Sequence, residues 1–262
     1  QELVVPFPRH RTKDVLVDPE FLRLSADLTE DLGADELDLA DDEHIEGLRS
    51  TMSRPTPWGA TRTPPSAAEL RKWSEMDVTG GSRSWMVPEP SVTVDDGEEI
   101  SLGRRTWLVV HTPGHTHDHL CLYDPADGLL LSGDHVLPTI TPHIGGIGPM
   151  DDPLATFFRS LERMKELPGV NNVLPAHGHP FTDVAGRVDA ILGHHEDRLE
   201  TIRKAGDDLG EGTVESYMHR LFKERSWGDM AASETYAHLE HLRILGRASR
   251  NEVAGQTIYR TS

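Results

Sequence analysis

The sequence predicts an α/β protein with a mainly helical C-terminal part, and three observations lead to that fold class. Short β-type segments separated by turn sequences follow one another between about residues 92 and 131. A helix with Asp152 as its cap and Pro153 at its first position comes next, before a further short strand at Val173-Leu174. Amphipathic helical patterns then dominate residues 183–262, and we find no internal repeat.

The N-terminal part differs in composition, with an acidic run and a proline-rich connector. Apolar positions between Pro19 and Leu32 recur at helical spacing, and residues 27–46 hold ten Asp or Glu without any Lys or Arg. We interpret this acidic run as the solvated face of a helix, with a patch for a cation or a basic partner as the alternative. After a proline-rich connector, Ser66 and Glu69 predict a capping box at the start of a short helix near Ser66–Ser74.

Turn residues and runs of β-branched residues predict the bounds of the remaining strands and helices. The expected strands are Ser91–Val94, Thr106–His111, His119–Tyr123, Leu129–Leu131 and Val173-Leu174. The expected C-terminal elements are helices Asp183–Ala205, Thr213–Phe222 and Ser233–Leu245, followed by extended pieces Arg247–Asn251 and Thr257–Arg260. Helix, helix, helix and hairpin is the element order of a winged-helix domain.

Composition narrows the function classes. The chain of 262 residues carries 26 Lys and Arg against 44 Asp and Glu, a formal net charge of −18, which disfavours nucleic acid as a partner. The single cysteine, Cys121, excludes an intrachain disulfide and thiolate-rich metal clusters, and we expect it to be a small buried side chain. Fifteen histidines point instead to metal binding or acid–base chemistry.

Hydropathy predicts no membrane span, because no apolar run approaches the roughly 20 residues that a bilayer requires. The chain begins at Gln1 without a basic and then apolar leader, so we expect a cytoplasmic protein. A native N-terminus that preceded Gln1 could have carried such a signal.

Three potential metal ligands follow strands. Pro113-Gly114 turns the chain after a strand and presents His115, Gly133 precedes Asp134, and a third strand leads to His177. Zinc accepts imidazole nitrogens and carboxylate oxygens, and the two oxygens of a carboxylate can bridge two ions. Each of these residues taken singly is more typical of a turn or a surface position, so the prediction rests on their combination.

The segments HTPGHTHDHLCLYD, LLLSGDHVL and VLPAHG occur in the order of the third, fourth and fifth motifs of the metallo-β-lactamase superfamily. The long helix with His194-His195 and Arg198, and the pattern after it, resemble the branch with a C-terminal winged-helix domain. The resemblance runs from about Val92 to the C-terminus. It implies an αββα sandwich, His115 on a first zinc, Asp134 bridging two zincs and His177 on the second.

One expected motif of that superfamily is missing. HxHxDH, which provides two ligands to each zinc, does not occur between Gln1 and His111, and HTHDH at residues 115–119 is one residue short. We therefore expect an N-terminally truncated metallo-β-lactamase-like domain over residues 1–182, with a helical acidic insert at about 19–75. Residues 183–262 would form the winged-helix-like domain.

Further histidines are candidates for supporting the metal ligands or contacting substrate. These are His135 and His143 beside the expected metal loop, His117 near His115, and His179 after the third ligand. For His194-His195 we favour pairing on the helix surface.

The resemblance implies hydrolysis by a metal-bound hydroxide at a centre of two zinc ions. We expect a small-molecule acyl substrate (thioester, ester or lactone), because the acidic composition disfavours polyanions. The alternatives are RNA phosphodiester hydrolysis and a non-catalytic remnant or interaction module. We do not expect nucleic acid as a partner, since helix Ser233–Leu245 carries Glu234 and Glu240 against Arg243 alone. The hydropathy likewise predicts no membrane partner. A homo-oligomer remains possible as an alternative.

Overall fold

The computed structural model describes residues 45–47, 49–50, 53–61, 64–70 and 93–262. The chain divides into two compact units, residues 1–56 with 61–93 and residues 57–60 with 94–262, and each is described by itself. The predicted helix over 19–32 lies outside the described residues, as do most of the acidic insert and the first two residues of the predicted strand Ser91–Val94. Its other two residues, Thr93 and Val94, are not in a strand.

In the first unit the predicted capping box is confirmed. The backbone N–H of Ser66 donates to Glu69 Oε2 at 2.8 Å, and the N–H of Glu69 donates to Ser66 Oγ at 3.2 Å. Each side chain thus satisfies a backbone donor that the start of a helix leaves without a partner. Nearby, Arg49 Nε donates to the carbonyl of Pro65 at 3.3 Å.

A five-stranded sheet organises the first part of the second unit. Its strands lie in sequence order; neighbours are antiparallel except β4 and β5, which are parallel. The strands are β1 (Glu99–Leu102), β2 (Arg105–His111), β3 (Leu120–Asp124), β4 (Leu129–Gly133) and β5 (Asn172–Pro175). Because β3 is antiparallel to both of its neighbours, β2, β4 and β5 run in the same direction and end at one edge of the sheet.

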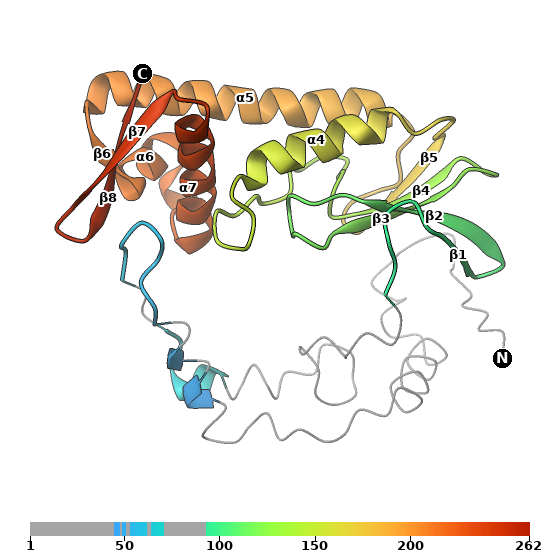
Figure 1. Cartoon of the computed structure of the whole chain (residues 1–262), viewed down its shortest axis with the longest axis horizontal. Coiled ribbons are helices and arrows are strands. Elements are labelled where there is room, and N and C mark those ends of the chain that lie inside the picture. Colours follow the sequence, from blue (N-terminus) through green and yellow to red (C-terminus); the bar gives the residue numbers. More distant parts are fainter. Residues whose placement is uncertain (1–44, 48, 51–52, 62–63, 71–92) are drawn as a thin grey trace. The chain divides into compact units, whose positions relative to one another are not determined.

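Two helices, α4 (Pro153–Lys165) and α5 (Val184–Leu209), lie on one side of this sheet (Figure 1). Asp152 caps α4 by accepting a hydrogen bond from the N–H of Ala155 at 2.9 Å, as the sequence predicts. Both helices supply apolar side chains to one core with the strands. Its fully buried members include Val110, Cys121, Leu130, Phe157, Leu161, Val173, Val188 and Ile191.

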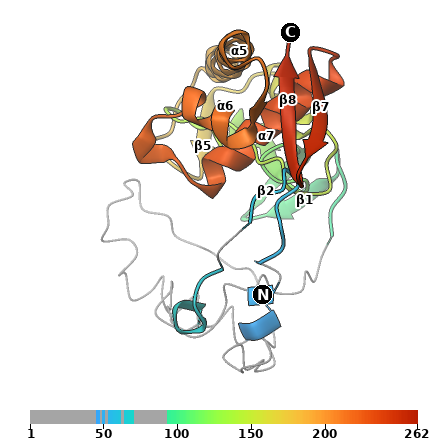
Figure 2. The same cartoon turned by 90° about the vertical axis from the view of Figure 1, so that its left-hand side faces the viewer.

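The C-terminal part packs around the second half of α5. Its elements are β6 (Gly212–Thr213), α6 (Val214–Leu221), the 3₁₀ turn η2 (Glu224–Ser226), α7 (Asp229–Ile244), β7 (Ala248–Val253) and β8 (Gln256–Thr261). The three strands form a sheet in the order β6-β8-β7, with the β7–β8 hairpin beside α7 (Figure 2). A second core lies here, and Trp58 joins it with its ring 5.1 Å from that of Tyr236.

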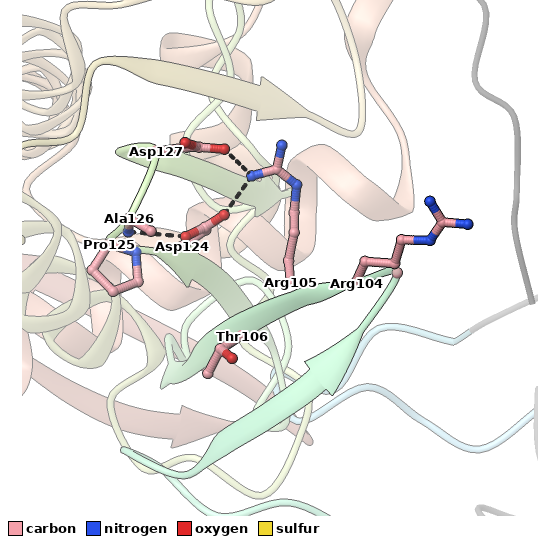
Figure 3. Close-up of a pocket in the computed structure, with 8 residues that line it drawn as sticks. Arg104, Arg105, Thr106, Asp124, Pro125, Ala126 and Asp127 are labelled. Atoms are coloured by element: carbon pink, nitrogen blue, oxygen red, sulfur yellow. Dashed lines mark hydrogen bonds and ion pairs between the residues drawn. The ribbon is translucent and has the colours of Figure 1, made fainter. Parts of the chain in front are cut away.

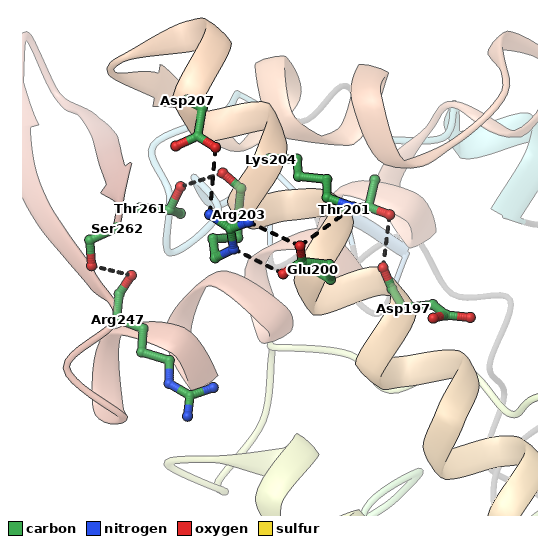
Figure 4. A network of polar contacts seen from close by, with 9 residues as sticks. All are labelled: Asp197, Glu200, Thr201, Arg203, Lys204, Asp207, Arg247, Thr261 and Ser262. Atoms are coloured by element: carbon green, nitrogen blue, oxygen red, sulfur yellow. Dashed lines mark hydrogen bonds and ion pairs between the residues drawn. The ribbon is translucent and has the colours of Figure 1, made fainter.

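The exposed face of α5 carries charged pairs one turn apart (Figure 4). Arg203 donates to Glu200 at 2.9 Å and lies 3.5 Å from Asp207, while Lys204 lies 3.4 Å from Glu200. Such exposed pairs contribute only about 0.3–0.5 kcal/mol each, so buried apolar contacts hold α5 in place. None of the helices among the described residues is both long and apolar enough to cross a membrane.

Several predicted elements are confirmed and others need correction. The strands at 106–111, 119–123, 129–131 and 173–174 and the helices after Asp152, Asp183 and Thr213 are present within one to four residues of the predicted bounds. Strand β1 and strand β6 were not predicted, because β1 is mostly exposed and lacks a buried apolar run, and β6 has only two residues. Helix α7 begins at Asp229, four residues earlier than predicted, after Gly228 with φ 149°.

Candidate metal centre

The predicted ligands lie where β2, β4 and β5 end. His115 is in the loop after β2, Asp134 follows β4 directly, and His177 is two residues beyond β5. The Nε2 atom of His177 lies 3.4 Å from Oδ1 of Asp134. The shared direction of the three strands thus delivers all three residues to one edge of the sheet, with Asp134 and His177 adjacent.

The turn into Asp134 requires a glycine. Gly133 has φ 51°, and the pairing of β4 with β5 shifts register between Leu131 and Gly133. A Cβ atom on Gly133 would lie 2.7 Å from Nε2 of His119. Both the backbone conformation and this close approach disfavour a side chain, so Gly133 lets the chain leave the strand sharply and present Asp134.

Asp134 carries the strongest sign of a missing ligand. Its Oδ1 atom is buried and has no hydrogen-bond partner among the described residues. The 3.4 Å contact with His177 does not have the geometry of a hydrogen bond. A buried carboxylate oxygen without a partner costs free energy, and a cation held between Asp134 and His177 would remove that cost. The residues present therefore fit a metal.

His115 is oriented for ligation. Its Nδ1 donates to the backbone carbonyl of His143 at 2.7 Å, which leaves Nε2 with a lone pair. Histidines that bind metals typically make this kind of hydrogen bond through the nitrogen that is not bound to the ion. The ligand atoms of His115, Asp134 and His177 do not all lie within 4.8 Å of one another, so the structure brings Asp134 and His177 together but not His115 with both.

His119 contacts the candidate centre, and the sequence did not single it out as part of that centre. Its Nε2 accepts a hydrogen bond from the backbone N–H of Asp134 at 3.1 Å. Its Nδ1 then carries the proton and donates to Thr112 Oγ1 at 2.7 Å. With both nitrogens engaged, His119 holds the backbone of Asp134 in place, and burial lowers the pKa of its ring.

The other candidate histidines differ in their surroundings. His135 is fully buried, neither of its ring nitrogens has a hydrogen-bond partner, and burial lowers its pKa to about 3. His143 donates from Nε2 to the carbonyl of Met230 at 3.0 Å and so ties the loop that supports His115 to the start of α7. His117 and His179 are exposed, and Nδ1 of His117 lies 3.8 Å from an oxygen of Asp118.

The predictions for two other residues have opposite outcomes. Cys121 is fully buried, as predicted, and burial raises the pKa of its thiol to about 12, so it is unreactive. The expectation that His195 pairs on the helix surface is wrong. Its ring is fully buried and contacts His238 of α7, because α5 is covered by the C-terminal helices at this point.

A cavity of about 480 Å³ lies at the opposite edge of the sheet, near the start of β2 (Figure 3). Arg105 reaches across it and donates to the carboxylates of both Asp124 and Asp127. Arg104 also lines the pocket, so its two arginines balance its two carboxylates and the pocket offers no net charge to a ligand. The candidate centre is therefore the strand edge that holds Asp134.

Comparison with known proteins identifies the family. The family model described as "Metallo-beta-lactamase superfamily" matches residues 41–180, and this chain belongs to that superfamily. A metallo-beta-lactamase family protein from Thermus thermophilus has a similar structure, with a TM-score of 0.62 and 26% sequence identity. That similarity covers 94% of this chain and 67% of the other.

Two curated relatives are named for hydrolysis of acyl compounds. A hydroxyacylglutathione hydrolase from Idiomarina loihiensis is 34% identical over 143 residues, which are 52% of this chain and 53% of that protein. An atrochrysone carboxyl ACP thioesterase from Aspergillus fumigatus is 31% identical over 115 residues, 42% of this chain and 25% of that protein. The chain spans about half the length, or less, of the curated relatives that it matches.

Proposed function

We propose that this chain provides the metal centre of a zinc-dependent hydrolase, with His115, Asp134 and His177 as ligands. The observation that carries the proposal is the buried, unpartnered Oδ1 of Asp134 beside Nε2 of His177. Two imidazoles and a carboxylate are a donor set that zinc commonly takes. In the complete centre Asp134 would bridge two zinc ions, with His115 on one and His177 on the other.

The proposed substrate is an activated acyl compound, namely a thioester, an ester or a lactone. Relatives named as a hydroxyacylglutathione hydrolase and an ACP thioesterase support this class. A net charge of −18 also favours a substrate other than a polyanion. Bound zinc would supply Lewis acidity and a water molecule whose pKa is lowered toward neutrality.

Neighbouring residues of the chain orient the proposed metal ligands. His119 fixes the backbone of Asp134, and the His143 carbonyl fixes the ring of His115. Holding ligands through such contacts lets the centre keep its geometry while charge develops on the substrate. His143 also donates to Met230 at the start of α7, so the C-terminal part supports the centre from outside the sheet.

We further propose that residues 183–262 form a winged-helix domain with a packing role. The order α5, β6, α6, α7, β7 and β8 supports that assignment. Most of α7 is buried, and its two buried carboxylates are paired within the protein, Glu234 with Arg198 and Glu240 with Arg243. A helix enclosed in this way cannot enter a nucleic-acid groove, which weighs against the alternative of RNA cleavage.

The test compares the purified chain with its Asp134→Asn variant. Zinc per polypeptide is measured by mass spectrometry, and turnover is measured on a panel of thioesters, esters and lactones. Losing the bridging carboxylate should remove at least one zinc per chain and lower turnover by about 100-fold or more. Asp118→Asn is the matched control, because that carboxylate is exposed and lies in the His115 loop.

Each result decides between the alternatives. Unchanged zinc content and turnover in Asp134→Asn would refute the bridging role. About two zinc ions in the unmodified chain that depend on Asp134 would mean that other residues complete the centre, with His10, His44, His117 or a second copy as candidates. Zinc near zero without turnover would instead favour the non-catalytic alternative for this chain.

A further inference from the structure

A second group of potential ligands lies away from the strand edge, between α5 and α7. His195 of α5 and both Glu234 and His238 of α7 each offer a ligand atom, and these atoms lie within 4.8 Å of one another. Among the described residues this is the only trio of His, Cys, Asp or Glu with that convergence. All three residues are buried, and we propose that they bind a divalent transition-metal ion that clamps α5 to α7.

The hydrogen bonds of the two rings leave one buried ring nitrogen without a partner. Nδ1 of His238 donates to the carbonyl of Glu234 at 2.7 Å, so its Nε2 carries a lone pair. Nδ1 of His195 lies 3.0 Å from that Nε2 and can donate to it, a hydrogen bond that a metal bound to Nε2 of His238 would replace. Nε2 of His195 is then a lone pair without any partner, buried where water cannot reach it. Such an orphaned acceptor is unfavourable unless something binds it.

The surroundings keep both rings in the form that metals require. Phe157 and Phe158 lie against His195, with ring centroids 5.7 and 5.8 Å away. Burial lowers the pKa of His195 to about 2 and that of His238 to about 3, so both are neutral at physiological pH. A metal would therefore displace no proton from a charged imidazolium in order to bind.

Glu234 gives the site its negative charge, and Arg198 competes for it. The Arg198 guanidinium donates to Oε1 of Glu234 and lies over the ring of Phe222, 4.7 Å from the centroid. A metal ion and Arg198 would both be drawn to the one carboxylate, and two cations close together in a buried site repel each other. Removing the arginine charge should thus tighten metal binding, whereas removing any of the three ligands should weaken it.

The donor set defines the class of metal. Two imidazoles and one carboxylate suit Zn²⁺, with Co²⁺ as a spectroscopic substitute, rather than Ca²⁺ or Mg²⁺, which prefer oxygen ligands alone. The site would stabilise the fold instead of acting on substrate, because its residues have almost no exposed surface. The proposal is independent of the proposed hydrolase activity.

The experiment uses the full chain with Asp134→Asn and His177→Ala already introduced, so that the strand edge does not contribute. Titration with Co²⁺ should give one equivalent of visible absorption typical of low coordination number. Free Zn²⁺ at 100 times the dissociation constant should raise Tm by about 5–10 °C. His238→Gln and Glu234→Gln should each lose the absorption and the rise in Tm, with His219→Gln, an exposed histidine of α6, as control.

A further variant protects the test against misfolding. Arg198→Gln should bind Co²⁺ more tightly than the background chain by about tenfold, the effect of one removed unfavourable charge interaction of about 1.4 kcal/mol. If the background chain binds neither ion at millimolar concentration, or if Arg198→Gln weakens binding, the proposal is overturned. The three residues would then be a hydrogen-bonded contact between two helices and nothing more.

Discussion

The backbone N–H of Asp134 donates to Nε2 of His119 at 3.1 Å, and this single contact ties the end of β4 to the loop between β2 and β3. The other nitrogen of the same ring bonds the buried hydroxyl of Thr112. His119 therefore joins two parts of the candidate centre that are separated in sequence, without being a ligand itself.

Replacing His119 with alanine should leave the Asp134 N–H without its partner and leave the Thr112 hydroxyl with only its longer contacts, 3.4 Å to the His119 carbonyl and 3.4 Å to Cys121 Sγ. We expect the free energy of unfolding to fall by about 1–3 kcal/mol, since each unsatisfied buried group carries such a cost. Urea denaturation in the presence of a chelator measures this effect apart from metal binding. His117→Ala, an exposed neighbour, should change the stability by less than about 0.5 kcal/mol. Equal effects of the two variants would contradict the role of His119.

Gly133→Ala should be more destabilising than substitution of a comparable glycine in open space. Gly133 and Gly97 both have positive φ, but of the two only Gly133 faces a neighbour, Nε2 of His119. Gly97→Ala should cost about 1 kcal/mol from backbone strain alone, and Gly133→Ala about 1–3 kcal/mol more. The comparison is made by thermal and urea unfolding, and a difference near zero would show that the His119 ring moves aside freely.

Stability should fall as pH is lowered from 6.5 toward 3. His135, His195 and His238 have folded-state pKa values of about 3, 2 and 3, below the value of about 6.5 in an unfolded chain. Between these pKa values the unfolded state binds protons that the folded state does not bind. The three neutral rings therefore contribute fully to the free energy of unfolding only above pH 6.5. Each ring can lower the free energy of unfolding by up to about 1.4 kcal/mol for each pH unit of acidification.

His135→Leu tests one of these contributions separately. It removes two buried nitrogens without partners, so we expect higher stability at pH 8, a larger gain at pH 5 and a shallower pH dependence. Urea unfolding at pH 8, 6, 5 and 4 without metal provides the measurement. If the slope is the same in both proteins, His135 is not neutral and buried in solution.

Asp152 should contribute more to the free energy of unfolding than a residue that only caps a helix. It accepts a hydrogen bond from Ala155 in α4, and its Oδ2 lies 2.9 Å from Nδ1 of His241 in α7. Asp183 caps α5 through Gly186 N–H at 2.8 Å and serves as the control. Asp183→Ala should cost about 1 kcal/mol and Asp152→Ala about 1–2 kcal/mol more, measured by urea unfolding at pH 7. Equal losses would leave Asp152 as a cap only.

Much of the fold followed from local chemistry. Proline at the first position after Asp152 and the strand-ending glycines placed α4, β2, β4 and β5 correctly, because these signals act within a few residues. The bounds of α7 were wrong because this helix is buried on nearly every side and its sequence lacks a clear apolar stripe. The domain boundary at 182/183, the cytoplasmic location and the expected partners remain predictions.

The positions of the candidate ligands were predictable only in part. His115, Asp134 and His177 follow β2, β4 and β5, and the shared direction of these strands places all three at one edge of the sheet, while their role as metal ligands stays a prediction. The part played by His119 depends on its rotamer and on the turn at Gly133, which no spacing in the sequence reveals. His195 was misjudged for a related reason: its burial depends on a helix more than thirty residues later.

Helix α5 has consequences for how the second unit unfolds. Its 26 residues extend about 39 Å and contribute Ile191 to the core beneath the sheet and Ile202 to the core beside α7. If either core unfolded, one half of helix α5 would lose its packing contacts, and that half would not be stable as a helix in water. The most protected amides of both cores should therefore exchange with deuterium at one common rate, as they do in a single cooperative folding unit.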